Sequence, residues 1–490
     1  MSQSRAFINN YIIQKRDSID NKYRLKFHMS CHVGWMNDPN GLVLFNNQYH
    51  LYYQAFPFRT KPGQMMWGRF ISPDLVRFED RGIALSLDTL GEHAFSGGSI
   101  VVDNHIHIYY TLHTEKNPQL IRYDGDVFEN YKDETFTEEE NEKRKHQERC
   151  NETKDIKEED IYHSSSIDGE EFEKGNKVFD NESLPKNINQ VDFRDPNPVK
   201  IGDTYYIFVG GKDNELNKGI IIVLKSKSLD HFEYAFTIGP FYELGDMAEC
   251  PSYFRIDDQD VLLVSGCNTY RRDNDFKNIN CSVFIVGNID FIKGTMHVDF
   301  IKEIDKGDTF YAPQFIREEN RPIMIGWLEM WAKNYPTSLM HHGYVGAFSF
   351  PRMLTIKDND IYQNPVKELD KYTKVVNKDY LPRQADISMD MPIGSHITIK
   401  GDNGELLIKN DIDGLSLDNH LSNGMFDCIR RTNNRYDNCH LRILLDTSSI
   451  ELFINDGKEA ISSRFYIDGI LHMENSKDIK NIVIKEVDVK

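Results

Sequence analysis

Five segments of the chain have the pattern of one hairpin, two short β-rich runs joined by a polar turn. The turns, NNQ, DNH, GDT, DDQ and EEN, are rich in residues that tight turns favour. Few amphipathic helical patterns separate the hairpins, so the sequence predicts an all-β fold. Recurrence at intervals close to the length of a propeller blade predicts a five-bladed β-propeller. The hairpins start at Gly41, Gly98, Asn197, Pro251 and Ala312.

The predicted catalytic propeller domain spans residues 1–350. Only the interval between the second and third hairpins is much longer than the others, and it contains the segment at about 126–160. This segment has many more acidic than basic residues and few apolar ones. We therefore expect a solvated insertion, a surface loop without a catalytic role.

The chain beyond the propeller is also β-rich. The runs ADISMDMPIGSHITIKG, LRILLDTSSIELFINDG and AISSRFYI alternate apolar and polar residues between Gly-containing turns. This pattern predicts a C-terminal β-sandwich over 366–490, with 351–365 as the linker.

Charge and composition narrow the classes of partner and compartment. A formal net charge of −19 disfavours nucleic acid and anionic membranes as partners. No run approaches the roughly 18 apolar residues of a membrane span, and the N-terminus lacks the apolar core of a signal peptide. The seven cysteines fit neither a zinc site nor a disulfide framework, which favours a reduced, cytoplasmic protein. Oligomeric state is left open.

Short polar signatures stand immediately before the hairpins or at their starts. They are WMNDPN (35–40), FSG (95–97), FRDP (193–196), AEC (248–250) and FY (310–311). Equivalent positions on the innermost strands of a propeller face one axis, so we expect Asp38, Asp195 and Glu249 to converge. Clustered carboxyl groups oppose each other's ionisation, and proteins keep such clusters mainly where function needs them.

Glycoside cleavage needs this combination: a carboxylate that attacks the sugar and a carboxylic acid that protonates the departing oxygen. Hydrogen-bonding and aromatic side chains suited to a sugar lie in or near the same signatures. The candidates are Trp35, Met36, Asn37, Gln54, Trp67, Phe95, Ser96, Arg194, Tyr311, Trp327 and Trp331.

Each feature alone has a simpler explanation. Asp-Pro-Asn-Gly is a good turn sequence, and Arg194 with Asp195 could form a plain ion pair. Trp327 and Trp331 could be core residues rather than a sugar platform. The interpretation depends on their joint recurrence beside the repeats.

The ordered set WMNDPNG, FSGG, FRDPNP, AECPS and FYAPQ resembles glycoside hydrolase family 32, the invertases, fructanases and sucrose-6-phosphate hydrolases. HHGYVGAFSFPRML (341–354) resembles the segment that closes the family's propeller, and DTSSIELFINDG (446–457) resembles a hallmark of its sandwich. The resemblance implies that Asp38 is the nucleophile, Glu249 the acid/base, and Asp195, with Arg194, the stabiliser of the transition state. It implies fructose contacts from Asn37, Gln54, Trp67, Phe95, Ser96 and Trp331, and neither a metal nor an organic cofactor.

These roles predict a retaining, two-step cleavage of terminal β-fructofuranosides such as sucrose 6-phosphate or sucrose, through a fructosyl-enzyme intermediate. We expect Asp38 to be ionised near its reference pKa of about 3.9 and Glu249 to be protonated, with carboxyl groups about 5–5.5 Å apart. A fructan hydrolase, a fructosyltransferase and a non-catalytic carbohydrate-binding propeller are the alternatives.

Some positions depart from the family pattern. Arg69 stands where the family has His, and Cys31–His32 replaces a Pro pair. Arg59, Lys61 or Arg69, which follow the first hairpin, are candidates for binding a substrate phosphate.

Overall fold

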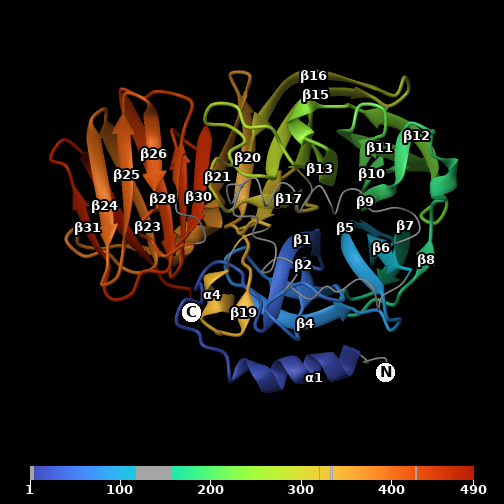
Figure 1. Cartoon of the computed structure of the whole chain (residues 1–490), viewed down its shortest axis with the longest axis horizontal. Helices are drawn as coiled ribbons and strands as arrows, with labels where there is room; N and C mark the ends of the chain where they lie inside the picture. The colour runs from blue at the N-terminus through green and yellow to red at the C-terminus, as the bar shows by residue number, and fades with distance from the viewer. Residues whose placement is uncertain are drawn as a thin grey trace, which may run out of the picture.

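The computed structural model describes residues 5–116, 157–318, 320–331, 333, 335–424 and 428–489. Two β-rich bodies lie side by side (Figure 1), a ring of sheets built from the N-terminal part of the chain and a pair of sheets at the C-terminus. The prediction of a β-propeller followed by a β-sandwich is confirmed. Helices are few in the described residues: α1 (Arg5–Arg16), α4 (Pro336–Leu339), and the 3-10 turns η1 (Asn181–Ser183), η2 (Tyr242–Leu244) and η3 (Lys367–Tyr372).

Five antiparallel sheets of the described chain form the ring, each starting with its innermost strand. The first blade is β1 (Gly34–Phe45), β2 (Gln48–Phe56), β3 (Met66–Ser72) and β4 (Glu79–Leu85). The second is β5 (Glu92–Val102), β6 (His105–Glu115), β7 (Lys157–Ser166) and β8 (Asn176–Lys177). The third is β9 (Ile188–Ile201), β10 (Thr204–Asp213), β11 (Lys218–Ser226) and β12 (Glu233–Ile238).

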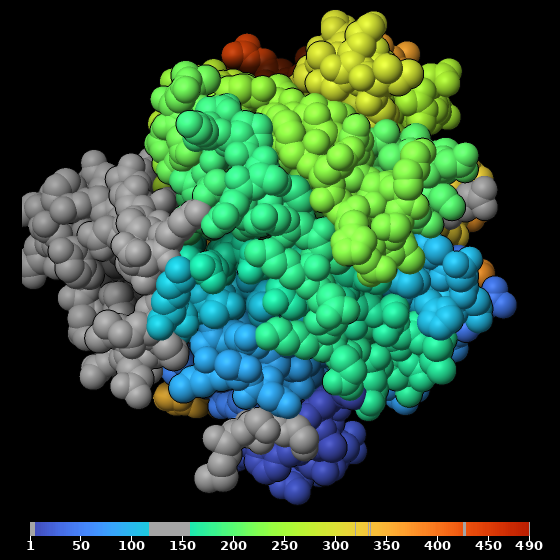
Figure 2. Space-filling model, turned by 90° about the vertical axis from the view of Figure 1, so that its right-hand side faces the viewer, coloured from blue at the N-terminus to red at the C-terminus, as the bar shows by residue number. Residues whose placement is uncertain are grey.

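The fourth blade is β13 (Met247–Ile256), β14 (Gln259–Cys267), β15 (Cys281–Asp290) and β16 (Thr295–Glu303). The fifth is β17 (Tyr311–Phe315), β18 (Ile323–Trp327), β20 (Arg352–Lys357) and β21 (Asp360–Pro365). Strands β1, β5, β9, β13 and β17 each contact the next, and β17 contacts β1, so the ring is closed. Figure 2 shows the side away from the sandwich, made mostly of residues from the second, third and fourth blades.

A short strand of the chain's fifth repeat fastens the ring. β19 (Tyr344–Val345) pairs in parallel with β1, with Tyr344 opposite Gly34 and Val345 opposite Trp35. It lies within 341–354, the segment that the family resemblance assigns to propeller closure.

Two expected boundaries differ from the structure. Residues 351–365, expected as a linker, supply β20 and β21, so the fifth blade extends to Pro365. Residues 157–160, expected in the acidic insertion, begin β7, which pairs with β6 up to Glu115 opposite Lys157. The hairpin pattern marks only the first two strands of each blade, which a short polar turn joins. The remainder of the insertion, 126–156, lies outside the described residues.

The C-terminal sheets pack face to face around a core of Ile, Leu and Met side chains. One sheet has the order β22 (Thr373–Val375), β32 (Lys480–Val487), β23 (Ala385–Pro392), β28 (Asn438–Asp446), β29 (Ser449–Ile454) and β30 (Glu459–Arg464). The other has the order β27 (Ile429–Arg431), β26 (Gly414–Asp418), β25 (Glu405–Asp411), β24 (Ser395–Lys400) and β31 (His472–Asn475).

A buried ionic network joins the sandwich to the propeller. Arg352 of β20 pairs with Asp305 at 2.9 Å and with Glu451 of β29, and all three side chains are fully buried. The imidazole of His28 lies between Asp446, 2.9 Å away, and Glu451, 2.7 Å away. Burial lowers the pKa of His28, but these two carboxylates outweigh it and raise the pKa to about 9. The two domains are therefore held in a fixed relation.

No helix in the described part of the chain is long and apolar enough to cross a membrane.

Candidate active site

Every inner strand of the propeller carries a β-bulge at the same level. In β1, Met36 lies opposite Ala55 and Pro39 opposite Tyr53, so two residues stand against Gln54 alone. The four other inner strands have the same register shift against their second strands. A bulge bends the strand and redirects its side chains. The bulged pairs are Asn37–Asp38, Phe95–Ser96, Asp195–Pro196, Cys250–Pro251 and Ala312–Pro313.

The sequence predicts that the three acids occupy equivalent positions of the inner strands, but in the structure they do not. Asp38 is the second residue of its bulge, Asp195 is the first, and Glu249 stands just before the bulge. Asp195 also has a φ of 65°. The local bend at each bulge, rather than a shared repeat position, brings the three carboxyl groups together.

The position before the bulge holds a second set of polar groups in three successive blades. Arg194 Nη2 donates to Glu249 Oε1 at 2.8 Å, and Tyr311 OH donates to Glu249 Oε2 at 2.6 Å. Glu249 is thus held from both sides, with 16% of its side chain exposed.

Asp38 is only 8% exposed and its two oxygens differ. Oδ2 accepts a hydrogen bond from Ser96 Oγ at 2.8 Å, whereas Oδ1 is buried without a hydrogen-bond partner. Burial raises the pKa of Asp38 to about 6, although the Ser96 hydroxyl opposes the shift. This differs from the reference value expected from the sequence, which does not show how far the carboxyl is removed from water.

Asp195 is linked to Asp38 through Cys250. The Cys250 N–H donates to Asp195 Oδ2 at 3.0 Å. The Cys250 thiol lies 3.5 Å from that oxygen and 3.6 Å from Asp38 Oδ2. Burial raises the pKa of Asp195, the Glu249 carboxylate raises it further, and Arg194 opposes both. The carboxyl groups of Asp38 and Asp195 therefore both contact one thiol, that of Cys250, which the sequence analysis did not single out.

Arg194 has a further partner that the sequence did not reveal. Its Nη1 donates to Glu159 Oε2 at 3.1 Å, and Glu159 is fully buried. Burial opposes the ionisation of Glu159, but the cations Arg194 and Lys157 hold its pKa well below the usual range. Arg194 thus pairs with Glu159, Glu249 and Asp192, rather than forming a simple ion pair with Asp195.

Aromatic side chains border the carboxyl groups. Trp35 Nε1 donates to Asn37 Oδ1 at 2.7 Å, and the Trp35 ring stacks on Trp331 at 5.8 Å. Trp327 is fully buried beneath them, whereas Trp331 is partly exposed. Phe95 is partly exposed and stacks on His113 at 4.3 Å. Trp327 is therefore a core residue, whereas Trp331 and Phe95 are partly exposed aromatic groups beside the carboxyl groups.

Of three other candidates, Gln54 and Trp67 hold the backbone of the second blade beside the site, and Met36 lies in the core. Gln54 Nε2 donates to the carbonyl of Ala94 at 2.9 Å, and Trp67 Nε1 donates to that of Phe95 at 3.0 Å. Both side chains are buried and fix the start of the second-blade bulge. Met36 is fully buried in the core of the first blade and has no surface for a ligand.

The three basic candidates for a phosphate contact are not alike. Arg69 is 6% exposed and binds the Gly169 carbonyl at 3.2 Å and Glu170 at 3.3 Å, so its guanidinium is already engaged. Arg59 and Lys61 flank Thr60, whose hydroxyl contacts that of Ser338 in α4 at 2.6 Å. The loop of Arg59 and Lys61 therefore lies near the chain segment that carries Trp331.

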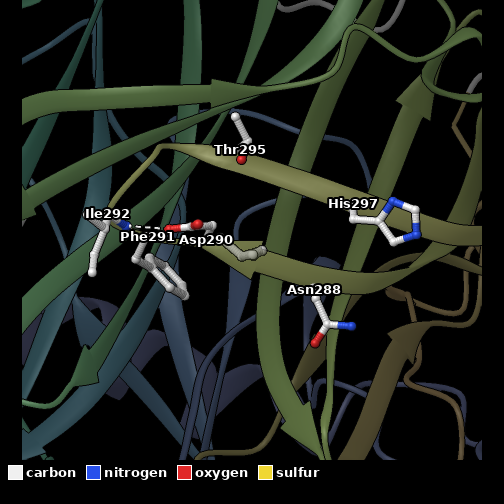
Figure 3. A pocket seen from close by; sticks show the side chains of 7 residues that line it. Asn288, Asp290, Phe291, Ile292, Thr295 and His297 are labelled. Carbon is white, nitrogen blue, oxygen red and sulfur yellow. Dashed lines mark hydrogen bonds between the residues drawn. The ribbon is translucent and has the colours of Figure 1, made fainter.

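A surface hollow on the fourth blade is separate from this site. It is formed at the turn between β15 and β16 (Figure 3), where Phe291 and Ile292 lie between the two strands. None of the carboxyl or aromatic groups described above lines it.

Comparison with known proteins decides the family. The family model "Glycosyl hydrolases family 32 N-terminal domain" matches residues 28–365, and the model "Glycosyl hydrolases family 32 C terminal" matches 400–488. The chain belongs to glycoside hydrolase family 32. The sucrose-6-phosphate hydrolase of Vibrio alginolyticus is 30% identical over 472 residues, covering 91% of this chain and 86% of the relative.

Solved structures of family members have the same fold. The Bombyx mori GH32 β-fructofuranosidase BmSUC1 has a TM-score of 0.81 at 24% identity, covering 99% of this chain and 98% of that one. The sucrose-6-phosphate hydrolase from Lactobacillus gasseri has a TM-score of 0.80 at 21% identity, covering 98% and 96%.

In this family 32 enzyme, the sandwich also supports the segment that carries Trp331. Glu329 accepts a hydrogen bond from Arg464 Nη1 at 2.5 Å, and both side chains are 3% exposed. Arg464 Nε in turn donates to the Ser448 carbonyl at 2.8 Å. Burial raises the pKa of Glu329 to about 7, and Arg464 opposes the shift. The ion pair therefore ties a propeller loop to the second domain two residues before Trp331.

We expect Arg464→Met to destabilise the protein by about 3 kcal/mol, because it leaves a buried carboxyl without its cation. The double variant Arg464→Met/Glu329→Gln should recover part of this loss, and urea unfolding measures both. The single variant should also raise the KM for sucrose, since Trp331 loses its support. A single variant as stable as the wild type would contradict this role.

Proposed function

We propose that this enzyme hydrolyses terminal β-D-fructofuranosides, with sucrose 6-phosphate and sucrose as substrates, in two steps with retention of configuration. The observation that carries the proposal is the convergence of Asp38, Asp195 and Glu249 at the bulges of three inner strands. The named activities of the relatives support the substrate class: sucrose-6-phosphate hydrolase in Vibrio alginolyticus, and a Bombyx mori β-fructofuranosidase of which a mutant was solved in complex with sucrose.

In the first step, Asp38 attacks the anomeric carbon of the fructosyl unit. Oδ1 is suited to form the bond because it has no hydrogen-bond partner, while Oδ2 is held by Ser96. Glu249, adjacent to Cys250, donates a proton to the departing glycosidic oxygen. In the second step Glu249 takes a proton from water, which attacks the fructosyl ester and frees Asp38.

Asp195 and Arg194 stabilise the charged transition state in this proposal. Asp195 is fixed by the Cys250 N–H and by its own N–H, which donates to Thr111 Oγ1 at 2.8 Å. Such preorganised groups stabilise developing charge without having to reorient during the reaction. The partly exposed aromatic groups Trp331 and Phe95 are suited to contact the sugar.

We also propose a cytoplasmic location. The six cysteines in the described residues are all free thiols, five of them buried, which is typical of a reducing compartment. A phosphorylated disaccharide is also an intracellular type of substrate.

Asp38→Asn should lower kcat on sucrose by about four orders of magnitude or more, because the amide cannot form the ester. The fold should be kept, since the amide can still accept the Ser96 hydrogen bond. The measurement is release of reducing sugar, with a thermal melt of the same sample. The Ser96→Ala variant keeps the carboxylate and should retain far more activity. Turnover by Asp38→Asn near the wild-type rate would exclude Asp38 as the nucleophile.

Glu249→Gln should lose activity mainly on substrates with poor leaving groups. A fructoside whose leaving group needs no proton should recover much of the rate of the first step, because the acid is then dispensable. Comparing sucrose with an activated aryl fructoside measures this. A rate loss of the same size on both substrates would argue against Glu249 as the acid.

The acid limb of kcat/KM should lie near pH 6. Asp38 must be ionised to attack, and its raised pKa means that the nucleophile is lost by protonation as the pH falls through about 6. A pH series on sucrose at concentrations below KM gives this limb. An acid limb near pH 4 would show that burial does not perturb Asp38 in this way.

A further inference from the structure

The loop between β14 and β15, residues 268–280, borders the catalytic groups. β14 ends at Cys267, whose thiol lies 3.6 Å from Tyr311 OH, the group that donates to Glu249. The Thr269 N–H donates to the Ile279 carbonyl at 2.8 Å, so the loop returns to the end of the blade from which it started. This loop therefore stands on the side of the site where Glu249 lies.

The sandwich closes over the same loop. Arg430 of β27 donates to Asn278 Oδ1, and Asn274 Nδ2 donates to the Thr432 carbonyl at 3.3 Å. Lys333, two residues after Trp331, approaches from the fifth blade. Burial raises the pKa of the Cys428 thiol to about 12, and the nearby charges of Arg430, Lys333 and Lys277 oppose the shift. Three separate segments thus place cations in one region.

We call this group the cationic cluster; its members are Arg271, Lys277, Lys333, Arg430 and Arg431. Neither Lys277 nor Arg271 has a hydrogen bond or ion pair with another described residue. Arg430 is 7% exposed, and its Nε is buried without an acceptor. Burial lowers the pKa of the partly exposed Lys277, and the nearby Arg430 and Arg271 lower it further. Lys277 and Arg271 therefore carry positive charge that no described hydrogen bond or ion pair neutralises.

The acidic groups nearby compensate only part of this charge. Arg431 pairs with Asp411 at 2.5 Å. Glu303 and Asp308 lie near Arg430, but burial raises the pKa of Glu303 to about 7 and raises that of Asp308 as well. Glu303 lies 3.7 Å from Lys306, and Asp308 accepts a hydrogen bond from Asn419, so neither carboxyl pairs with Lys277 or Arg271. The positive charge of these two residues remains available to an anion.

We propose that the cationic cluster binds the phosphate of a fructoside whose leaving hexose carries a phosphate ester. The inference rests on the proposed function, because Glu249 acts there on the oxygen that leaves with the hexose. The hexose must then lie on the Glu249 side of the site, where loop 268–280 and Lys333 stand. Guanidinium and ammonium groups are the usual ligands of phosphate oxygens. The cluster thus sets the preference between sucrose 6-phosphate and sucrose, and Arg69 has no part in it.

The test compares the two substrates in variants that remove the unpaired cations. Lys277→Gln, Arg271→Gln and the double variant should each leave kcat/KM on sucrose within about twofold of the wild type. On sucrose 6-phosphate the double variant should lose about tenfold or more, mainly through KM, because charge-assisted contacts are lost. Lys293→Gln, an exposed lysine at the tip of the same blade, is the matched control and should change neither value.

A second experiment uses the phosphorylated product of the reaction as an inhibitor. Glucose 6-phosphate should inhibit sucrose hydrolysis by the wild type more strongly than glucose does, and this difference should disappear in the double variant. Should a substitution disturb folding, as a melt would show, the exposed site alone can be tested with Arg271→Glu, which should weaken use of sucrose 6-phosphate still further.

Each failure is distinguishable. If the wild type cleaves sucrose but does not favour the phosphorylated substrate, or if the double variant keeps the preference, the cluster is not the phosphate site. Loss of the preference in Arg59→Gln or Lys61→Gln but not in the double variant would assign the phosphate to the loop after β2. A wild type that cleaves neither substrate would overturn the proposed function itself.

Discussion

The closed ring of five bulged inner strands is the constraint on which the site depends. Each inner strand carries its polar residues at a β-bulge, where its hydrogen bonding to the second strand is interrupted. The bulge redirects those side chains, which would otherwise alternate between the two faces of the sheet. Removing a strand from the ring would leave the buried carboxyl groups of its neighbours without their partners. Asp38 needs Ser96 from the second blade, and Asp195 needs the Cys250 N–H from the fourth. The catalytic groups are therefore held in position only when the ring of blades is closed.

The electrostatics of the site follow from this geometry. Burial raises the pKa values of Asp38 and Asp195, and the neighbouring charge of Glu249 raises both further. Arg194 lowers the free-energy cost of burying these carboxyl groups, because its guanidinium lies between Glu249 and the buried Glu159. The sandwich adds to this framework through Arg464 and through β27, which packs on the loop after β14. In this account the second domain is part of the wall of the site, and the buried network around Arg352 keeps it in place.

Much of the fold could be predicted from the sequence because the inner hairpins are buried on both faces and read as continuous apolar runs, as in β10 and β14. The outer strands are harder to recognise. β16 alternates exposed and partly buried residues. β20 and β21 follow a long excursion of the chain to β19, so the sequence predicts a linker at 351–365, where the structure has two strands. Asp38, Asp195 and Glu249 could be found because short polar signatures stand beside each hairpin. Glu159 could not, because it lies in an acidic run and only the fold surrounds it with Arg194 and Lys157. The sequence likewise does not show which of the candidate site residues reach solvent: Trp331 is partly exposed, whereas Trp327, Trp67 and Met36 are buried.

The central claim is that the ring gathers its acids so that Asp38 can bond covalently to a fructosyl unit. The most direct measurement is to mix the Glu249→Gln variant with an activated fructoside, quench it in acid, and map the digested protein by mass spectrometry. Breakdown of the intermediate is slow without its base, so the account predicts one added fructosyl unit on the peptide that contains Asp38. A fructosyl unit on another residue, or an unmodified protein together with a first product of inverted configuration, would contradict it.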